Sequence, residues 1–540
     1  MWQQNYDPLG SPYACAFIAA VPILIFLLGL TLFKLKGLTA SGLSLAAALV
    51  VAAAVFGMPL QSVLAAALFG VLNGLWPIGY IVLMAVWLYR LAVKSGKFET
   101  IRSSISTISA DQRIQVILIA FCFGAFLEGV AGFGVPIAIC AALLVELGFK
   151  PIKAAMLCLI ANAASGAYGA IGIPVLVGAQ QGGVPLADLS LKMIAIVQLS
   201  TLFIPALLVT IMDGTRGLRQ TWPVVLGIGV LFSVSQSAIL FWLGPELVDI
   251  VPPLVSMGAL ALFMRFWRPV FIYREDGGAV PPPEVKWRLR QVLSAWSPFY
   301  VLTVLVLLWS LPQFKALFVS QGLLEGTVRH WPIPSLDQVV TVVPPIVSQP
   351  ADLRAVWHVA LISAPGTAIL LASLVTVLFA ATLSWRAACT EFGLTVKQLW
   401  RPIAMICLIM AVAYIANFSG GSSSIGLGMA GAGGIFPLLS PVIGWLGVFI
   451  TGSVVNSNTL FANLQVITAT QIDVSTSLMV AANTSGGVMG KLISPQSIAI
   501  AAVAVGQVGQ EGKIMRMTLG YSLGLLLYVS LWTWLLSGAA

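Results

Sequence analysis

The sequence predicts an all-α membrane protein with about twelve transmembrane helices and two re-entrant hairpins. Two observations lead to this fold class. Hydrophobic residues make up 59% of the 540 residues and charged residues only 8%, with a mean hydropathy of +1.00. A water-soluble domain needs far more charge to keep its surface solvated. In addition, apolar stretches of about 20 residues, the length of one transmembrane helix, recur from Ala14 almost to the C-terminus.

The apolar stretches define the expected elements in chain order. Segments 115–147 and 435–466 are apolar and rich in glycine, but each is long for one helix and short for two crossings. We therefore expect each of these segments to form a hairpin that enters the membrane and returns. The other stretches are expected to cross the membrane, at residues 14–33, 38–56, 72–93, 154–180, 191–212, 223–243, 247–266, 291–311, 355–383, 402–418, 476–505 and 517–538.

The distribution of basic residues predicts the orientation of the chain. With the N-terminus outside, 22 of the 27 Lys and Arg residues fall in cytoplasmic stretches and 4 in external stretches. Basic residues near transmembrane ends concentrate on the cytoplasmic side, which favours this orientation. The net charge of +9 is explained by these loops, so no nucleic-acid partner is expected. Residues 265–290 are expected to form the main cytoplasmic loop and residues 312–354 the main external loop.

The charge pattern also orients the two hairpins. Arg113 precedes the first hairpin, and Lys150 and Lys153 follow it, so both of its ends are expected in the cytoplasm. Between Arg401 and Lys491 there is no Lys or Arg, so the second hairpin is expected to enter from outside. The two hairpins would therefore have opposite orientations.

The two hairpins share a sequence pattern. Residues 124–129 read G-x-F-L-x-G and residues 447–452 read G-x-F-I-x-G, at an offset of 323. Two related halves of opposite orientation form an inverted repeat, an architecture of many secondary transporters. Chance similarity between glycine-rich membrane segments is the alternative. A second match has an offset of 321. The four residues Asn162, Gly166, Gly169 and Pro174 have the same spacing as Asn483, Gly487, Gly490 and Pro495.

An inverted repeat divides the chain into three parts. The first repeat is expected at residues 1–212, the linking helices and the cytoplasmic loop at 213–290, and the second repeat at 291–540. In each repeat the hairpin precedes a glycine-broken helix, expected at residues 154–180 and 476–505.

The substrate site is expected at the hairpin tips and the broken helices. Backbone without helical hydrogen bonds persists at membrane depth only where it is buried in protein or lines a wet cavity. Tight packing of small residues is the alternative role for the glycines, and it explains the run from Gly426 to Gly434. It explains buried Asn side chains poorly, since a buried amide needs hydrogen-bond partners. The expected substrate-binding residues are Lys491, Asn162, Ser165, Asn456, Ser457, Asn458, Asn483, Ser485, Gly129, Gly132, Gly134, Thr451 and Gly452.

Glu128 and Lys491 are the two ionisable residues expected deep in the membrane. An intramembrane charge costs roughly 2.5–3.5 kcal/mol on insertion scales and marks a functional site by default. Lys491 is expected to bind an anionic substrate. Glu128 is expected to carry a proton, because desolvation favours the neutral form of a carboxyl group. A structural ion pair between the two residues, tying the halves together, is the alternative.

Motifs of other protein classes are absent from the sequence. There is no Walker A phosphate loop, which argues against ATP-driven transport. Neither HExxH nor GxSxG occurs, which argues against the common intramembrane hydrolases. The six cysteines are scattered without metal-binding spacing. We therefore expect a carrier of a small anion, not an enzyme, with no cofactor and no metal.

Three blocks of the sequence resemble bacterial lactate permeases: residues 2–8 (WQQNYDP), residues 121–134 (FCFGAFLEG, then GFG) and residues 490–496 (GK, then SPQ). The resemblance covers nearly the whole chain. It implies proton-coupled uptake of L-lactate and related 2-hydroxy monocarboxylates, such as glycolate and D-lactate, across the bacterial inner (cytoplasmic) membrane. It also implies membership of a wider group of ion transporters with paired hairpins and elevator-like movement, often as homodimers in the lipid bilayer.

One stretch departs from the pattern of that family. Lactate permeases tend to read Asn-Thr-Ala-Pro-Val-Ala-Phe-Gly where residues 162–169 read NAASGAYG. Because the stretch follows the first hairpin, the departure bears on the choice of substrate more than on the transporter class. A sodium-coupled carrier of another small organic anion and an anion channel are the main alternatives, followed by a membrane-embedded enzyme.

Overall fold

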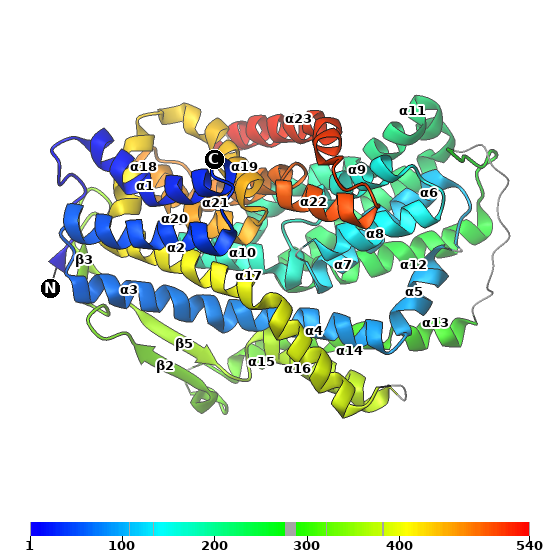
Figure 1. The fold of residues 1–540 in the computed structure, drawn as a ribbon, viewed down its shortest axis with the longest axis horizontal. Helices are drawn as coiled ribbons and strands as arrows, with labels where there is room; N and C mark the ends of the chain where they lie inside the picture. Colours follow the sequence, from blue (N-terminus) through cyan, green and yellow to red (C-terminus); the bar gives the residue numbers. More distant parts are fainter. Residues whose placement is uncertain are drawn as a thin grey trace.

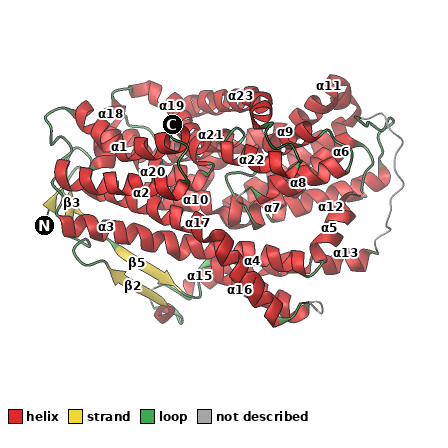
Figure 2. Cartoon of the chain, viewed as in Figure 1, coloured by secondary structure: helices red, strands yellow, loops and turns green. Residues whose placement is uncertain are grey.

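The computed structural model describes residues 2–106, 108–132, 134–275, 288–319, 321–380 and 383–538. Most of these residues are helical, and the helices pack into one elongated body with short β-strands at its edge (Figures 1 and 2). Of the expected main cytoplasmic loop, residues 276–287 lie outside the described part of the chain.

The N-terminal region consists of one short strand and several helices. Its elements are β1 (Trp2–Gln3), α1 (Pro12–Thr31), α2 (Gly37–Val50), η1 (Val51–Val55), α3 (Leu60–Asn73), η2 (Gly74–Gly79), α4 (Tyr80–Lys94) and α5 (Lys97–Ser106). The crossing expected at 72–93 begins too late, because Leu60–Lys94 forms one apolar helical stretch of 35 residues. This stretch is interrupted at Trp76, whose φ of −132° and ψ of 120° are not helical.

The segment expected as the first hairpin folds back on itself. It contains α6 (Gln112–Val116), η3 (Ile117–Phe123), α7 (Gly124–Val130) and α8 (Val135–Glu146). The turn between α7 and α8 uses Gly132 (φ 57°) and Gly134 (φ 83°), conformations that residues with a Cβ rarely adopt. Phe133 lies outside the described residues. The Gln112 side chain donates to Leu147 O over 3.3 Å, so the two ends of the segment lie side by side.

The segment at residues 154–180 is interrupted near its middle. It consists of α9 (Pro151–Ala161), η4 (Asn162–Ala164) and α10 (Gly169–Gly182), with a bend of 48° between the two parts. Ala170 and Ile171 have φ values of 47° and 61°. A left-handed backbone is costly for any residue with a Cβ and especially for a β-branched one. The surrounding structure therefore holds this stretch in a strained conformation.

The link between the halves contains a pair of antiparallel helical arms within α11 (Leu186–Trp242). Asp213 and Gly214 break α11, since their backbone angles are not helical. Ser233 Oγ donates to Gln198 O over 2.9 Å, which places the two arms side by side. A tight connection with η5 (Pro245–Leu247) then leads into α12 (Val251–Phe266).

The second half begins with short helices and strands and ends in long helices. Its first elements are α13 (Leu289–Ala295), α14 (Ser297–Ser310), α15 (Pro312–Ala316), η6 (Glu325–Thr327), β2 (Val328–Pro332), β3 (Val340–Val342), β4 (Ala351–Asp352) and β5 (Val356–Ala360). Its later elements are α16 (Pro365–Phe379), α17 (Trp385–Ser419), α18 (Gly421–Ala430), η7 (Gly433–Ile435), α19 (Phe436–Thr451), α20 (Val454–Gln471), α21 (Thr476–Lys491), α22 (Pro495–Ala504) and α23 (Glu511–Gly538).

The segment expected as the second hairpin also folds back on itself. α19 and α20 are joined by a turn at Gly452, whose φ is 70°. Gln465 on α20 donates to Ser440 O on α19 over 3.3 Å, so these helices are antiparallel neighbours. α21 and α22 follow, separated by residues 492–494. The order of a helix–turn–helix followed by an interrupted helix therefore occurs in both halves.

The described residues are mostly helical, as expected for an all-α membrane protein, with short strands beside the helices: β1 pairs with β3, β3 with β4, and β2 with β5. One expectation about the second half is wrong. The crossing expected at 355–383 includes strand β5, and its helix begins only at Pro365. β5 (VWHVA) pairs antiparallel with β2 (VRHWP). Cross-strand pairs of aromatic and β-branched residues stabilise such a two-stranded ribbon. Figure 2 shows β2 and β5 at the edge of the helical body.

The long α17 also differs from the expected crossing at 402–418. It begins at Trp385, so Lys397 and Arg401, which the charge pattern assigned to a loop, are helical. Figure 1 shows α17 in yellow alongside α2 and α3 in blue. The approach is close, since a Cβ on Gly70 of α3 would lie 2.5 Å from the Ala411 backbone. The first turns of α17 are polar and were not expected to be helical. Tertiary packing stabilises the helix there.

Within the described residues, 10 helices are long and apolar enough to cross a membrane, or up to 11 if the bent pair α9–α10 forms one span. The expected number was twelve. Three of the apolar helices, α8, α14 and α16, have only 12, 14 and 15 residues. A helix of 20 residues spans about 30 Å, so these three are short for a full crossing.

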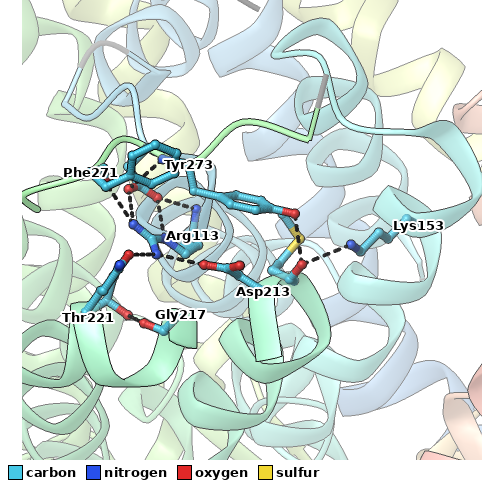
Figure 3. A network of polar contacts seen from close by, with 10 residues as sticks. Arg113, Lys153, Asp213, Gly217, Thr221, Phe271 and Tyr273 are labelled. Carbon is cyan, nitrogen blue, oxygen red and sulfur yellow. Dashed lines mark hydrogen bonds and ion pairs between the residues drawn. The ribbon is translucent and has the colours of Figure 1, made fainter. Parts of the chain in front are cut away.

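A buried ionic network holds the base of the first hairpin (Figure 3). The Arg113 side chain is fully buried and pairs with Asp111 at 2.7 Å and with Asp213 at 2.9 Å. It also donates to Gln220 Oε1 and to Phe271 O. The sequence placed Arg113 at the hairpin's cytoplasmic end as a loop charge; in the structure it joins that end to α11 and to the segment after α12.

Candidate functional site

A central cavity of about 580 Å³ lies where the turns of the two helix–turn–helix segments meet α2 and α17. Gly132 and Gly134 from the first turn and Gly452 and Asn456 from the second turn line one wall. The opposite wall comes from the start of α2 and the middle of α17. The residues on that wall are Lys36, Gly37, Leu38, Thr39, Gln398, Leu399, Trp400, Arg401, Pro402, Met405 and Ile406.

Glu128 and Lys491 meet at this cavity. Lys491 Nζ lies 2.7 Å from Glu128 Oε1, and both residues line the cavity. The Lys491 side chain is 9% exposed and the Glu128 side chain is 2% exposed. Glu128 Oε2 accepts a second hydrogen bond from Asn162 Nδ2 at 2.9 Å. The carboxylate therefore has a cation on one oxygen and an amide on the other, which satisfies it when it is ionised.

Glycines allow the surrounding backbone to approach this ion pair. Gly169, at the start of α10, faces the Glu128 carboxylate, and a Cβ there would collide with Glu128 Oε1. Gly129 packs against the connection before α12, where a Cβ would lie 2.6 Å from Asp249 O. Gly452 similarly faces the Gln496 side chain. These positions need glycine because neighbouring atoms occupy the space of any side chain.

Asn456 is a polar residue of the cavity wall that can bind a ligand. Its side chain is buried, and neither its Oδ1 nor its Nδ2 has a hydrogen-bond partner among the described residues. Asn162 Oδ1 and Ser165 Oγ, close to the Glu128 side of the site, are also buried and have no partner within the part of the chain that the structure describes. A buried amide without partners costs about 1–3 kcal/mol, so a ligand that bonds to these atoms is favoured.

Several of the expected substrate-binding residues do not line the cavity. Asn458 Nδ2 donates to Pro174 O at 2.8 Å, and its Oδ1 accepts from Asn483 Nδ2 at 2.9 Å. This amide network connects α20 to α10 and α21. Ser457, Ser485 and Thr451 donate to the backbone carbonyls of Gly444, Ala481 and Gly447, respectively. These residues therefore form hydrogen bonds within the protein and do not line the cavity.

Several residues that line the cavity were not expected from the sequence. Ser453 caps α20 by accepting from Asn456 N, and Gln496 and Ser497 lie at the start of α22. Gln496 belongs to the SPQ block (residues 494–496) that resembles lactate permeases, and this resemblance could have identified it. Lys36 and Arg401 were counted as loop charges, and only the packing of α2 against α17 brings them to the cavity.

The cavity is electropositive. Its charged lining residues are Lys36, Arg401, Lys491 and Glu128, three basic and one acidic. Neither Lys36 nor Arg401 has an ion-pair partner among the described residues, while Glu128 already neutralises Lys491. A concave site with excess positive charge raises the local concentration of small anions.

Comparison with known proteins is consistent with an anion site. The sequence model of the L-lactate permease family matches residues 15–538. The L-lactate permease of Halalkalibacterium halodurans is 46% identical over 540 residues, covering 99% of both chains. The L-lactate permease of Escherichia coli K12 is 47% identical, covering 97% of this chain and 96% of the relative. The glycolate permease GlcA of the same strain is 44% identical, covering 97% and 95%. The chain therefore belongs to the L-lactate permease family.

Proposed function

We propose that this protein imports L-lactate and related 2-hydroxy monocarboxylates, including glycolate and D-lactate, together with protons across the bacterial cytoplasmic membrane. The family and the names of its relatives, which include lactate and glycolate permeases, support this substrate class. The observation that carries the proposal is the buried Glu128–Lys491 pair at 2.7 Å in an otherwise electropositive cavity.

The substrate carboxylate competes with Glu128 for Lys491. When the anion takes the ammonium group, Glu128 is left as an isolated buried carboxylate. An isolated buried charge is too costly to persist, so Glu128 binds a proton. One anion and one proton therefore enter the site together, and the buried charge stays balanced. Asn456, whose amide has no partner among the described residues, is placed to bind the remaining polar atoms of the substrate.

Alternating access in this proposal uses the two halves as an inverted repeat. The repeats are residues 1–212 and 291–540, joined by residues 213–290. Their re-entrant hairpins (115–147 and 435–466) and broken helices (154–180 and 476–505) form one wall of the cavity and move together in an elevator-like step. α2 and α17 supply the opposite wall, and a homodimer in the lipid bilayer would hold this wall in place. The shared order of elements in both halves supports this arrangement.

The charge pattern suggests the direction in which the cavity opens. Lys36 and Arg401 line it, and both fall at the cytoplasmic ends of their expected crossings. The cavity therefore corresponds to a state that releases substrate into the cytoplasm.

Uptake into proteoliposomes tests the proposal. Labelled L-lactate is offered under an imposed inward proton gradient, with and without Na⁺, and glycolate is added as a competitor. We expect accumulation against the lactate gradient that needs protons, does not need Na⁺ and is inhibited by glycolate. Absence of lactate transport under every gradient would refute the substrate class.

A sodium-coupled carrier is the second candidate. Asn162 Oδ1, Ser165 Oγ and Asn456 Oδ1 are buried oxygens without a partner in the described part of the chain, the type of group that binds Na⁺ in transporters. Accumulation that depends on Na⁺ at a fixed pH would favour this candidate. Flux that never exceeds equilibrium under any gradient would instead favour an anion channel.

A further inference from the structure

Asp249 is a buried carboxyl group that belongs to neither half of the expected repeat. It lies in the connection between α11 and α12, and only 1% of the residue is exposed. No described Lys or Arg side chain forms an ion pair with it. A carboxylate without a cation is strongly disfavoured in such surroundings. The proposed transport step does not use this group.

The hydrogen bonds around Asp249 fit a neutral carboxylic acid. Gln236 Nε2 donates to Asp249 Oδ1 at 3.0 Å. Asp249 Oδ2 and Gln236 Oε1 are both buried acceptors without a partner among the described residues. A proton on Asp249 Oδ2 turns that atom into a donor, and a cyclic pair between an acid and an amide satisfies both groups. An ionised Asp249 would leave both acceptors unsatisfied.

Asp249 lies directly behind Glu128. A Cβ on Gly129, the residue after Glu128, would lie 2.8 Å from Asp249 Cβ. The Asp249 carboxyl group interacts electrostatically with Glu128, Lys491 and Tyr168, which are all buried. Gly169, adjacent to Tyr168, contacts the Glu128 carboxylate. Asp249, Tyr168 and Glu128 are thus buried in the same region of the protein.

Asp249 packs against Gly129 outside the central cavity. It does not line that cavity, whereas Glu128 does. Three residues before Asp249, Glu246 lines a second cavity of about 420 Å³ together with Lys315 and His358. Lys315 lies within the loop expected outside the membrane (residues 312–354), and His358 follows that loop. Asp249 is therefore three residues from a cavity on the expected external side, and it packs against Gly129, the residue after Glu128.

We infer that Asp249 is the proton donor to Glu128, supplying it from the external side. This inference rests on the proposed proton-coupled function. When the substrate anion displaces Glu128 from Lys491, the proton on Asp249 Oδ2 passes to the Glu128 carboxylate. Asp249 is then ionised until a proton from the external side replaces the lost one. The net change is one proton and one anion taken up, and no other reactant is needed.

Substitution of Asp249 tests this role. Asp249→Asn keeps the shape and the hydrogen bond with Gln236 but removes the transferable proton. We expect the initial rate of proton-driven lactate uptake to fall roughly 100-fold, the lower end of the effect of a positioned proton-transfer group. Exchange of internal for external lactate without a proton gradient should stay within about twofold of wild type. Asp249→Glu, which restores an acid, should recover part of the proton-driven rate.

The matched control is Asp188→Asn, the same substitution at an exposed acid on α11. It should leave both proton-driven uptake and exchange unchanged. Wild-type uptake by Asp249→Asn would overturn the inference. Equal loss of uptake and exchange in both Asp249 variants would also overturn it, because it would indicate a structural role.

Infrared difference spectroscopy separates this inference from the proposed function. Adding L-lactate to purified protein should change the carbonyl band of a protonated carboxyl group, and Asp249→Asn should lack this change while Asp188→Asn keeps it. If wild-type protein fails to accumulate lactate with protons, the proposed function fails, yet this spectrum still reports the protonation of Asp249. A band change that persists in Asp249→Asn would refute the assignment.

Discussion

Lys491 Nζ lies 2.7 Å from Glu128 Oε1, although the two residues are 363 positions apart in the chain. Glu128 is on α7, next to the turn of the first helix–turn–helix segment, and Lys491 ends α21, at the interruption before α22. The two halves of the chain therefore each contribute one charge to a single buried pair. Proton and anion binding are coupled in our proposal because both ligands compete for this one contact.

Glu128→Gln should abolish proton-driven accumulation of lactate while preserving exchange of bound substrate. Glutamine retains the shape of the side chain and the contact with Asn162 but carries no transferable proton. The measurement is uptake into proteoliposomes with a proton gradient, compared with counterflow without one. Accumulation at the wild-type level in this variant would remove Glu128 from the coupling mechanism.

Lys491→Ala should raise the KM for lactate, because it removes the buried cation that binds the carboxylate. Charge-assisted hydrogen bonds of this kind contribute about 1.5–3 kcal/mol, which corresponds to roughly a 10- to 150-fold change in KM. Lys513→Ala, which removes an exposed lysine at the start of α23, is the control and should not change KM. An unchanged KM in Lys491→Ala would assign the lysine a purely structural role.

Gly169→Ala should impair transport, since the added Cβ would collide with the Glu128 carboxylate and displace it from Lys491. Gly520→Ala on α23 is the matched control, because nothing lies within 4 Å of a Cβ at that position. We expect lower uptake at an unchanged expression level for Gly169→Ala, and normal uptake for Gly520→Ala. Normal uptake by both variants would show that the glycine is not required for the position of Glu128.

Arg113→Gln should lower the thermal stability of the protein. The substitution leaves Asp111 and Asp213 without their buried cation, and breaking such a pair costs about 3–5 kcal/mol. The measurement is the midpoint of thermal unfolding in detergent. Lys150→Gln removes an exposed side chain 3.7 Å from Glu275, which keeps the closer partner Lys153 at 3.3 Å, so this control should change the midpoint little. Similar midpoints for the two variants would contradict the assignment of Arg113 as the anchor of the hairpin base.

Pairing of β2 with β5 should weaken as the pH falls. His330 Nδ1 and His358 Nδ1 lie 2.6 Å apart, and burial, followed by the charge of His330, lowers the pKa of His358 from its usual 6.5. A lowered pKa means that the unfolded ribbon binds protons more readily than the paired one. This contact therefore stabilises the ribbon above pH 6.5, the pKa of His358 in the unfolded chain. Its contribution is lost as the pH falls towards the lowered pKa of His358 in the folded ribbon.

Hydrogen exchange at the amides of β2 and β5 measures this effect. Exchange, corrected for its intrinsic pH dependence, should become faster between about pH 7.5 and about pH 5. His358→Asn should remove the pH dependence, because it removes the ring whose pKa is lowered. Equal protection at both pH values in the wild-type protein would contradict the prediction.

Much of the architecture could be predicted from local patterns. Apolar stretches of transmembrane length identify most of the long helices, because burial in lipid demands apolar side chains regardless of what packs beside them. The glycines at 132, 134 and 452 marked the turns, where the structure has positive φ values. Glu128 and Lys491 stood out because ionisable residues are rare in such stretches. The resemblance to lactate permeases is confirmed by the family match.

Other features depended on contacts between distant segments. The strands β2 and β5 are short and lie in a loop, and each is stabilised only by its partner. Lys36, Arg401 and Asp249 resembled ordinary charges near helix ends in the sequence. Their roles arise because α2 packs against α17 and because the connection before α12 packs against Gly129.

The sequence by itself determined that this chain is a helical membrane protein of the lactate permease family with two deep charges, since composition and local motifs carry that information. Only the tertiary structure decided that Glu128 pairs with Lys491, that Asn456 and not Asn458 faces the cavity, and that Asp249 lies behind Glu128. The physical reason is that burial, ion pairing and unsatisfied hydrogen bonds are properties of neighbours in space. Segments hundreds of residues apart supply those neighbours, and a linear pattern does not specify them.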